Sequence, residues 1–230
     1  MNDITIYMFP GLGADETIFR NLHLPGYNIK HIRWIKPLND ETVAEYAKRL
    51  RYQIDPGTTP VLFGLSFGGM MAQEMAKLID PAMTIIVSSI KTMHDKPLQM
   101  KLAKRLRPHK FVPSLLAIEF DFWYPWAFGK TTKMEKSFIK KMAKGIHPDF
   151  TDWATDAAIN WDNTETVTNL VHIHGEKDNL FPSCYIKDKD FILVKGGTHF
   201  MVYNRADEVA NIVLEKLETL QQPKKLRKVS

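Results

Sequence analysis

Cysteine is the scarcest residue of this 230-residue chain, and Cys184 is its single example. One cysteine excludes an internal disulfide and is typical of proteins that fold in a reducing cytosol. Long apolar runs are also missing, because no stretch approaches the ~18 consecutive apolar residues of a transmembrane helix. Asn2 and Asp3 precede the first apolar stretch, unlike the basic start of a secretory signal peptide. These absences predict a cytoplasmic protein without a membrane span.

The charge of the chain is only moderately unbalanced, with a formal net charge of +5 and a sequence pI of about 9.1. Four of the positive charges stand in the last seven residues, at Lys224, Lys225, Arg227 and Lys228. The rest of the chain is therefore close to neutral. A basic tail over 223–230 can touch nucleic acid or an acidic surface, but it is more simply a solvated end. The sequence predicts no nucleic-acid partner.

Glycine-rich loops that hold nucleotides are absent or incomplete. No Gly-x-x-x-x-Gly-Lys phosphate loop occurs. Gly11 and Gly13 follow an apolar stretch, but Glu16 stands where a dinucleotide-binding loop needs its third glycine. Cys184 lacks a histidine in the arrangement of cysteine hydrolases, which leaves it a plain thiol. The sequence therefore predicts no cofactor.

A metal site is the sharpest alternative chemistry. His172 and His174 stand two residues apart on a strand-like segment, so they point the same way, and Asp178 follows. The fuller His-x-His-x-Asp-His pattern is absent, since Glu176 and Lys177 fill its last two positions. Histidines on a strand are more often hydrogen-bonded in the core than bound to metal. No metal is expected.

Strand-like and helix-like segments alternate along most of the chain. The expected strands are residues 4–9, 28–35, 60–65, 83–89, 169–174 and 190–194. Near-continuous apolar runs are typical of parallel strands that are buried on both faces. The alternation predicts an α/β protein, with a mostly parallel sheet of about six strands and helices on both faces. Asn39 or Asp40 is expected to cap a helix over 41–52 with an inward stripe formed by Val43, Ala44, Ala47 and Leu50.

Ser66 stands where a predicted strand ends and a predicted helix, residues 70–79, begins. Gly64 and Gly68 surround it in the pattern Gly-x-Ser-x-Gly. This order is typical of a nucleophile elbow, a strand-to-helix turn so tight that its central residue has strained backbone geometry. Glycine is needed on both sides because a Cβ there would collide with the adjoining strand and helix. The pattern predicts an exposed serine hydroxyl at the carboxyl end of the sheet.

Two further reactive side chains follow later strands. Asp178 comes after the strand at 169–174, and His199 comes after the strand at 190–194. A histidine can accept the proton of a serine hydroxyl, and a carboxylate can hold that imidazole in the correct tautomer. The chain order Ser66, Asp178, His199 is that of α/β-hydrolases and differs from the other two common serine hydrolase orders. The sequence thus resembles the α/β-hydrolase superfamily over nearly its whole length.

The resemblance implies an oxyanion hole made of two main-chain N–H groups, those of Leu12 and Phe67. Gly11 precedes Leu12 in the loop after the first strand, where the superfamily usually has His-Gly-x; here Pro10 replaces the histidine. The chain opens on the strand that leads into this loop. The resemblance therefore implies a trimmed fold that lacks the superfamily's first two strands.

The alternation of strands and helices stops between Ser89 and Asn169. The resemblance implies a helical cap over 90–169, inserted into a core formed by 1–89 and 170–222. The expected cap helices are 96–106, 113–120, 131–144 and 148–160. Its many aromatic side chains suit an apolar pocket, although most of them can equally fill the space between cap and sheet. The candidate pocket residues are Trp123, Trp126 and Phe200.

The resemblance implies a serine hydrolase that cleaves a small-molecule carboxylic ester or thioester through an acyl-Ser66 intermediate. The same fold and the same three side chains also occur in lyases and in C–C bond hydrolases. Some members bind a small molecule and barely turn it over. These alternatives remain open from the sequence alone.

Overall fold

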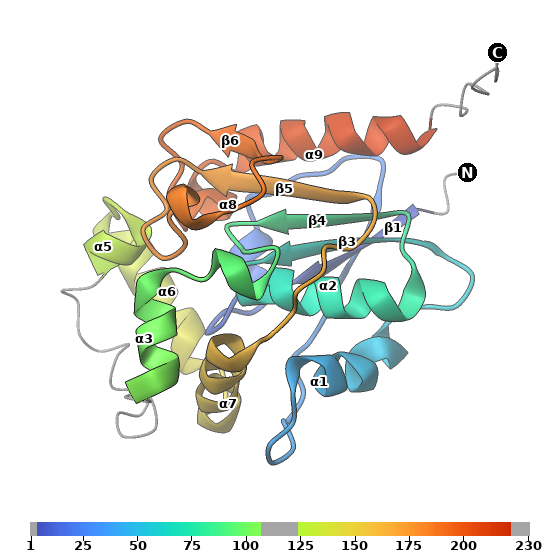
Figure 1. Cartoon of the computed structure of the whole chain (residues 1–230). Coiled ribbons are helices and arrows are strands. Elements are labelled where there is room, and N and C mark those ends of the chain that lie inside the picture. Colours follow the sequence, from blue (N-terminus) through green and yellow to red (C-terminus); the bar gives the residue numbers. More distant parts are fainter. Residues whose placement is uncertain (1–3, 107–123, 222–230) are drawn as a thin grey trace.

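A single parallel sheet forms the centre of the molecule (Figure 1). The structure is a computed structural model that describes residues 4–106 and 124–221. Its six strands have the order β2-β1-β3-β4-β5-β6, and each neighbouring pair is parallel. They are β1 Ile4–Phe9, β2 Asn28–His31, β3 Thr59–Leu65, β4 Met83–Val87, β5 Leu170–Gly175 and β6 Ile192–Val194. The predicted fold class is confirmed.

Strand β2 ends at His31, whereas the sequence predicted a strand up to residue 35. The N–H of Ile32 still donates to the Met8 carbonyl, at 2.9 Å. The N–H of Arg33 instead donates to the Gln53 side chain. From Arg33 onward the main chain is therefore no longer part of the strand. The apolar pattern beyond this point belongs to a partly buried loop and not to a strand.

The sheet carries a hydrophobic core on each face. Alternation along β1 sends Ile6 and Met8 into one core and Tyr7 and Phe9 into the other. One face is covered by α1 Val43–Leu50 and α2 Phe67–Ile79. The opposite face is covered by the 3-10 helix η1 Glu16–Phe19 and by α8 Met201–Asn204 and α9 Ala206–Gln221. Burial on both faces explains the near-continuous apolar strands.

Helix α1 differs from its prediction at its start and on its buried face. Its N-cap is Thr42, whose hydroxyl accepts from the Glu45 N–H while the Glu45 carboxylate accepts from the Thr42 N–H. This capping box begins the helix later than Asn39 or Asp40 would. Val43, Ala47 and Leu50 are buried as predicted, but Ala44 is exposed and Tyr46 takes its place on the buried face. A tyrosine is tolerated there because its hydroxyl bonds the main chain of Ile35.

The segment between β4 and β5 is helical. It contains α3 Leu98–Leu106, α5 Tyr124–Phe128, α6 Lys133–Lys144 and α7 Pro148–Asn160. Figure 1 shows these helices gathered beside the carboxyl ends of the strands, where the arrowheads lie. The helix predicted over 113–120 falls outside the described residues. The helical insertion therefore sits at the edge of the sheet where Ser66 was predicted to be.

Two cationic side chains stabilise the insertion: Arg20 links it to the core, and Lys96 links its first segment to its last helix. The guanidinium of Arg20 lies 4.3 Å from the Phe138 ring of α6 and 4.9 Å from the Tyr203 ring of α8. The buried ammonium of Lys96 donates to the carbonyls of Ile159 and Trp161 at the end of α7. Burial lowers the pKa of Lys96 to about 8. Main-chain carbonyls at a helix C-terminus suit a cation, so this contact holds α7 in place.

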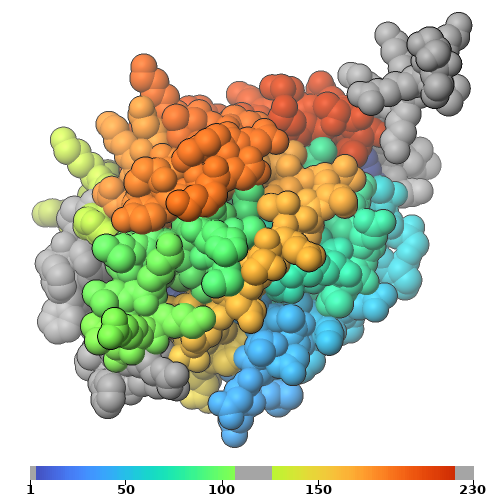
Figure 2. All heavy atoms as spheres, in the orientation of Figure 1, coloured from blue at the N-terminus to red at the C-terminus, as the bar shows by residue number. Residues whose placement is uncertain are grey.

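The loop after β5 packs on the segment that follows β4. Lys91 Nζ donates to Asp188 Oδ2 at 2.6 Å, and the Lys187 N–H donates to Asp95 Oδ1 at 2.8 Å. Figure 2 shows the two segments, in orange and green, side by side on one continuous surface. These contacts fix the loop that carries Asp178.

Among the described residues, no helix has both the length and the apolarity needed to cross a bilayer. The basic tail over 223–230 lies outside the described residues.

Candidate active site

Ser66 occupies the tight turn between β3 and α2. Its backbone has φ 54° and ψ −119°, a conformation that side-chain-bearing residues rarely adopt. The Ser66 N–H donates to the Val87 carbonyl at 2.9 Å. The Ser66 carbonyl accepts from the Gly69 N–H at 2.8 Å and from the Ser89 hydroxyl at 2.7 Å. The surrounding hydrogen bonds thus hold the strained turn that the sequence predicted.

Gly64 and Gly68 have no room for a side chain. A Cβ on Gly64 would lie 2.3 Å from the Gly68 carbonyl oxygen. A Cβ on Gly68 would lie 2.2 Å from the Phe9 carbonyl oxygen. At Gly11 the same atom would meet Ser66 Cβ at an ordinary 3.5 Å. The elbow therefore requires its two glycines for close packing against main-chain atoms, while Gly11 is less constrained.

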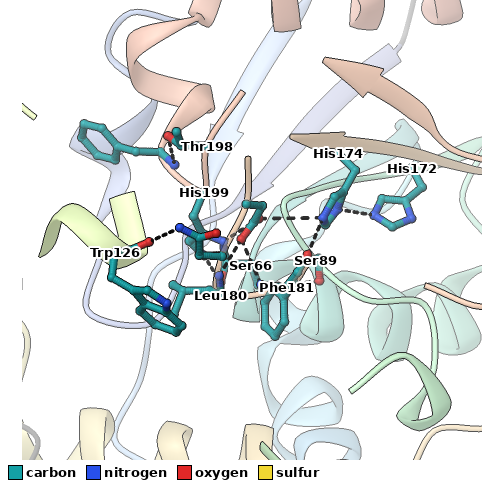
Figure 3. Close-up of polar contacts among 12 residues, drawn as sticks. Ser66, Ser89, Trp126, His172, His174, Leu180, Phe181, Thr198 and His199 are labelled. Atoms are coloured by element: carbon teal, nitrogen blue, oxygen red, sulfur yellow. Dashed lines mark hydrogen bonds and ion pairs between the residues drawn. The ribbon is translucent and has the colours of Figure 1, made fainter. Parts of the chain in front are cut away.

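Ser66, His199 and Asp178 form one hydrogen-bonded chain (Figure 3). His199 Nε2 lies 2.9 Å from Ser66 Oγ, and His199 Nδ1 lies 2.8 Å from Asp178 Oδ2. The three side chains come from the turn after β3, the loop after β5 and the loop after β6. Neighbouring parallel strands end at the same edge, which is why residues so distant in sequence meet. The sequence predicted this meeting from the residue types, their chain order and their positions just after strands.

Hydrogen bonds from the main chain hold the Asp178 carboxylate. Its Oδ1 accepts from the Leu180 N–H at 3.0 Å and from the Phe181 N–H at 2.9 Å. Burial by itself raises the pKa of Asp178, but the His199 charge and hydrogen bond, His174 and the Phe181 N–H together bring that pKa below its ordinary value. An ionised carboxylate only accepts, so Nδ1 of His199 is the donor. Neutral His199 then offers Nε2 as acceptor for the Ser66 hydroxyl.

Two aromatic rings beside His199 were not predicted from the sequence. The Phe181 ring lies edge-on to the His199 ring, with centroids 5.5 Å apart. The Phe128 ring of α5 lies 6.4 Å from the same imidazole. Phe181 follows Asp178 by only three residues, and that closeness is the one signal in the sequence. These rings shield the imidazole from solvent, and His199 is only 7% exposed.

The predicted pocket residues lie in different settings. Phe200 is buried and stacks on Tyr203, with centroids 4.7 Å apart. Trp126 on α5 is 47% exposed, and its carbonyl accepts from the Asn179 side chain. Trp123 is outside the described residues. The role of all three in a substrate pocket stays a prediction.

Leu12 and Phe67 lie in the two segments that flank Ser66. Phe67 is the first residue of α2, directly after Ser66, and its side chain is buried. Leu12 lies in the loop after β1, beside Gly11, whose main chain approaches Ser66. Their main-chain N–H groups therefore belong to segments that adjoin the hydroxyl. That these two N–H groups donate to the oxyanion stays a prediction.

A cleft of about 540 Å³ adjoins this region. It lies between the loops that follow β1 and β2 and the turn that joins α6 to α7. Trp34 and Phe150 line it, and both rings pack on Phe67, at centroid distances of 5.8 and 6.4 Å. Pro10 lines it as well, directly before Gly11. Neither Trp34 nor Phe150 was predicted from the sequence, because their approach depends on the fold of the insertion.

The two strand histidines bond each other. His172 Nε2 lies 3.1 Å from His174 Nδ1, and His174 Nε2 lies 2.6 Å from the Phe181 carbonyl oxygen. In the part of the chain that the structure describes, no group of three or more His, Cys, Asp or Glu could hold a metal ion. Cys184 is an exposed free thiol.

A parallel sheet with an elbow after its third strand, and with a helical insertion before its fifth, is the architecture of an α/β hydrolase. The family model described as "Alpha/beta hydrolase family" matches residues 8–212. The chain therefore belongs to the α/β hydrolase family. No curated protein matches it.

Solved structures share this fold at low sequence identity. MenH from S. aureus has a TM-score of 0.76 at 17% identity, with 96% of each chain covered. ClbQ from the colibactin NRPS/PKS pathway has a TM-score of 0.65 at 18% identity, covering 96% of this chain and 99% of ClbQ. The esterase EaEST from Exiguobacterium antarcticum has a TM-score of 0.69 at 13% identity, covering 96% and 93%. At such identities the likeness shows the fold alone.

Proposed function

We propose that the protein is a serine hydrolase that cleaves a carboxylic ester or thioester through an acyl-Ser66 intermediate. The observation that carries this proposal is the contact of His199 with Ser66 Oγ on one side and with Asp178 on the other, at 2.9 and 2.8 Å. A serine hydroxyl is a poor nucleophile until a base takes its proton. Here the base, its orienting carboxylate and the strained serine already stand in contact.

The reaction proceeds in two halves. Ser66 Oγ attacks the carbonyl carbon while His199 Nε2 takes the hydroxyl proton, and Asp178 stabilises the resulting imidazolium. The bond from that carbon to the leaving oxygen or sulfur then breaks, and His199 gives its proton to the leaving group. In the second half, water attacks the acyl carbonyl carbon while His199 takes a proton from it. The bond to Ser66 Oγ then breaks, His199 returns the proton to Ser66, and the acid is released. No cofactor is needed for either half.

The developing oxyanion needs donors that are fixed before the reaction. Under this proposal they are the main-chain N–H groups of Leu12 and Phe67. Loss of one such donor typically costs roughly 3–4 kcal/mol of transition-state stabilisation. Phe67 is held by packing of its ring against Trp34 and Phe150, which supports a rigid site.

The acyl substrate is a small or medium, mostly apolar molecule under this proposal. Aromatic rings surround the site, with Phe128 and Phe181 at the imidazole and Trp34 and Phe150 in the adjoining cleft. The structural likeness to an esterase, EaEST, agrees with ester chemistry. The low cysteine content agrees with work in the cytoplasm.

A panel of esters and thioesters with graded acyl length tests the reaction class. We expect hydrolysis with a clear optimum in acyl length, because a pocket of fixed size favours one chain length over its neighbours. We also expect full activity in excess EDTA, since each step uses only protein side chains. Loss of activity with the chelator would favour a metal hydrolase. Absence of turnover on the whole panel, by folded protein, would favour a non-ester reaction or a binding protein.

A further inference from the structure

Two buried histidines, His172 and His174, lie to one side of Ser66 and His199 (Figure 3). His172 and His174 project from the same face of β5, with ring centroids 5.0 Å apart. The proposed reaction steps use neither of them. Their hydrogen bonds nevertheless lead from the strand to the loop that holds the Asp178 carboxylate.

The direction of these hydrogen bonds follows from elementary chemistry. The Phe181 carbonyl can only accept, so Nε2 of His174 carries the hydrogen in their 2.6 Å contact. Burial lowers the pKa of His174, and the ring is therefore neutral and has a lone pair on Nδ1. His172 must then donate from its own Nε2 across the 3.1 Å contact. Burial lowers the pKa of His172 as well, so both rings are neutral Nε2–H tautomers.

Phe181 connects this pair to the active site through three different groups. Its carbonyl accepts from His174, and its N–H donates to Asp178 Oδ1 at 2.9 Å. Its ring lies edge-on against the His199 ring. The Nε2–H group of His174 also lies 3.9 Å from Asp178 Oδ2, the oxygen that bonds His199. A shift of Phe181 would therefore move both the carboxylate and the imidazole.

We propose that His174 is a positioning residue for the reaction, holding the Phe181 main chain so that Asp178 stays aligned with His199. His172 has the accessory role of fixing the His174 tautomer. This inference rests on the proposed hydrolase function. It assigns to the pair a role in acyl transfer that requires no metal and no proton shuttle.

Burial lowers the pKa of both histidines and outweighs the charges around them. Asp178 and Asp95 favour a protonated His174, and His199 opposes it, but burial outweighs them all. Around His172, Lys91 and His174 disfavour the charged form, while Asp188 and the Ser89 main chain favour it. Burial again has the largest effect. The neutral His174 ring therefore keeps the single Nε2–H that donates to the Phe181 carbonyl.

The test compares two amides at position 174 by their rate of labelling with a fluorophosphonate probe. In His174→Gln the amide nitrogen reaches about as far as Nε2 and can still donate to Phe181, whereas in His174→Asn it is one methylene too short. We expect His174→Gln to label within about threefold of the parent and His174→Asn to label about 10- to 100-fold more slowly, the loss typical when a side chain that supports a functional group is removed. Rescue by the longer amide reports the hydrogen bond to Phe181, because both variants lose the imidazole ring.

A matched control separates positioning from stability. Ile173 is buried on the opposite face of β5. Ile173→Ala should lower the thermal midpoint and leave the labelling rate of the folded protein near that of the parent. Parent-like labelling by both amides, or equal slowing by both, would overturn the inference.

A second measurement uses the parent protein. Nitrogen-15 NMR of the imidazoles should show both His172 and His174 as Nε2–H tautomers, and an Nδ1–H tautomer at His174 would also overturn the inference. Ser66→Ala separates this inference from the proposed function. If that variant labels like the parent, the proposed function fails; if it does not label while His174→Asn matches the parent, only the positioning role fails.

Discussion

Ser66→Ala is expected to abolish turnover of a short p-nitrophenyl ester, with a loss of about 10³-fold or more by analogy with other serine nucleophiles. The substitution removes only Oγ, the atom that lies 2.9 Å from His199 Nε2. Its thermal midpoint should hardly change, because the strained turn is held by the main-chain bonds of Ser66 and by Ser89, which the substitution leaves in place. Steady-state kinetics and a thermal melt measure the two effects.

Ser88 provides a matched control for this variant. It also has a left-handed backbone, with φ 48°, and it directly follows the neighbouring strand β4. Within the described residues its buried hydroxyl has no hydrogen-bond partner. Ser88→Ala should therefore keep both activity and stability. Equal turnover by Ser66→Ala and the parent would overturn the nucleophile assignment.

Gly68→Ala is expected to lower the free energy of unfolding by about 3 kcal/mol or more, at the upper end of overpacking effects. The new Cβ would lie 2.2 Å from the Phe9 carbonyl oxygen and 2.3 Å from that of Pro10. Both atoms are main chain at the end of a central strand, so they cannot move aside as a flexible side chain would. The same clash displaces the loop that leads to Leu12, and activity should fall too. Urea unfolding followed by circular dichroism measures the loss.

Gly57→Ala is the control for the glycine variant. Gly57 has φ +86°, and nothing lies within 4 Å of a Cβ placed there. Its substitution should cost only the strain of the left-handed backbone, about 1–2 kcal/mol. A loss at Gly68 no larger than the loss at Gly57 would contradict the packing explanation of the elbow.

The elbow and the meeting of the three reactive side chains could be predicted from the sequence, because each depends on a residue pattern at the end of a strand. Gly-x-Ser-x-Gly between a strand and a helix has few alternative conformations. Asp178 and His199 each follow a parallel strand, and the carboxyl ends of such strands share one edge of the sheet. The Ser66 site could thus be predicted from residue types and strand ends, without any knowledge of side-chain packing.

The surroundings of the site could not be predicted in the same way. Trp34 and Phe150 meet on Phe67 only because α7 packs beside the sheet, a contact between residues far apart in sequence. The strand spacing of His172 and His174 predicted that they share a face. Their partner could not be predicted, because the Phe181 carbonyl is a main-chain atom that every residue carries. Side-chain identity carries no information about such a bond.

Labelling with a fluorophosphonate probe, followed by peptide mapping in a mass spectrometer, tests the central claim most directly. The probe reacts with serines that a neighbouring base activates, so its attachment reports the working contact between Ser66 and His199. We expect rapid formation of one adduct on the peptide that contains Ser66, and no adduct there in Ser66→Ala. Folded parent protein that stays unlabelled, or that carries the adduct on another residue, would contradict the account.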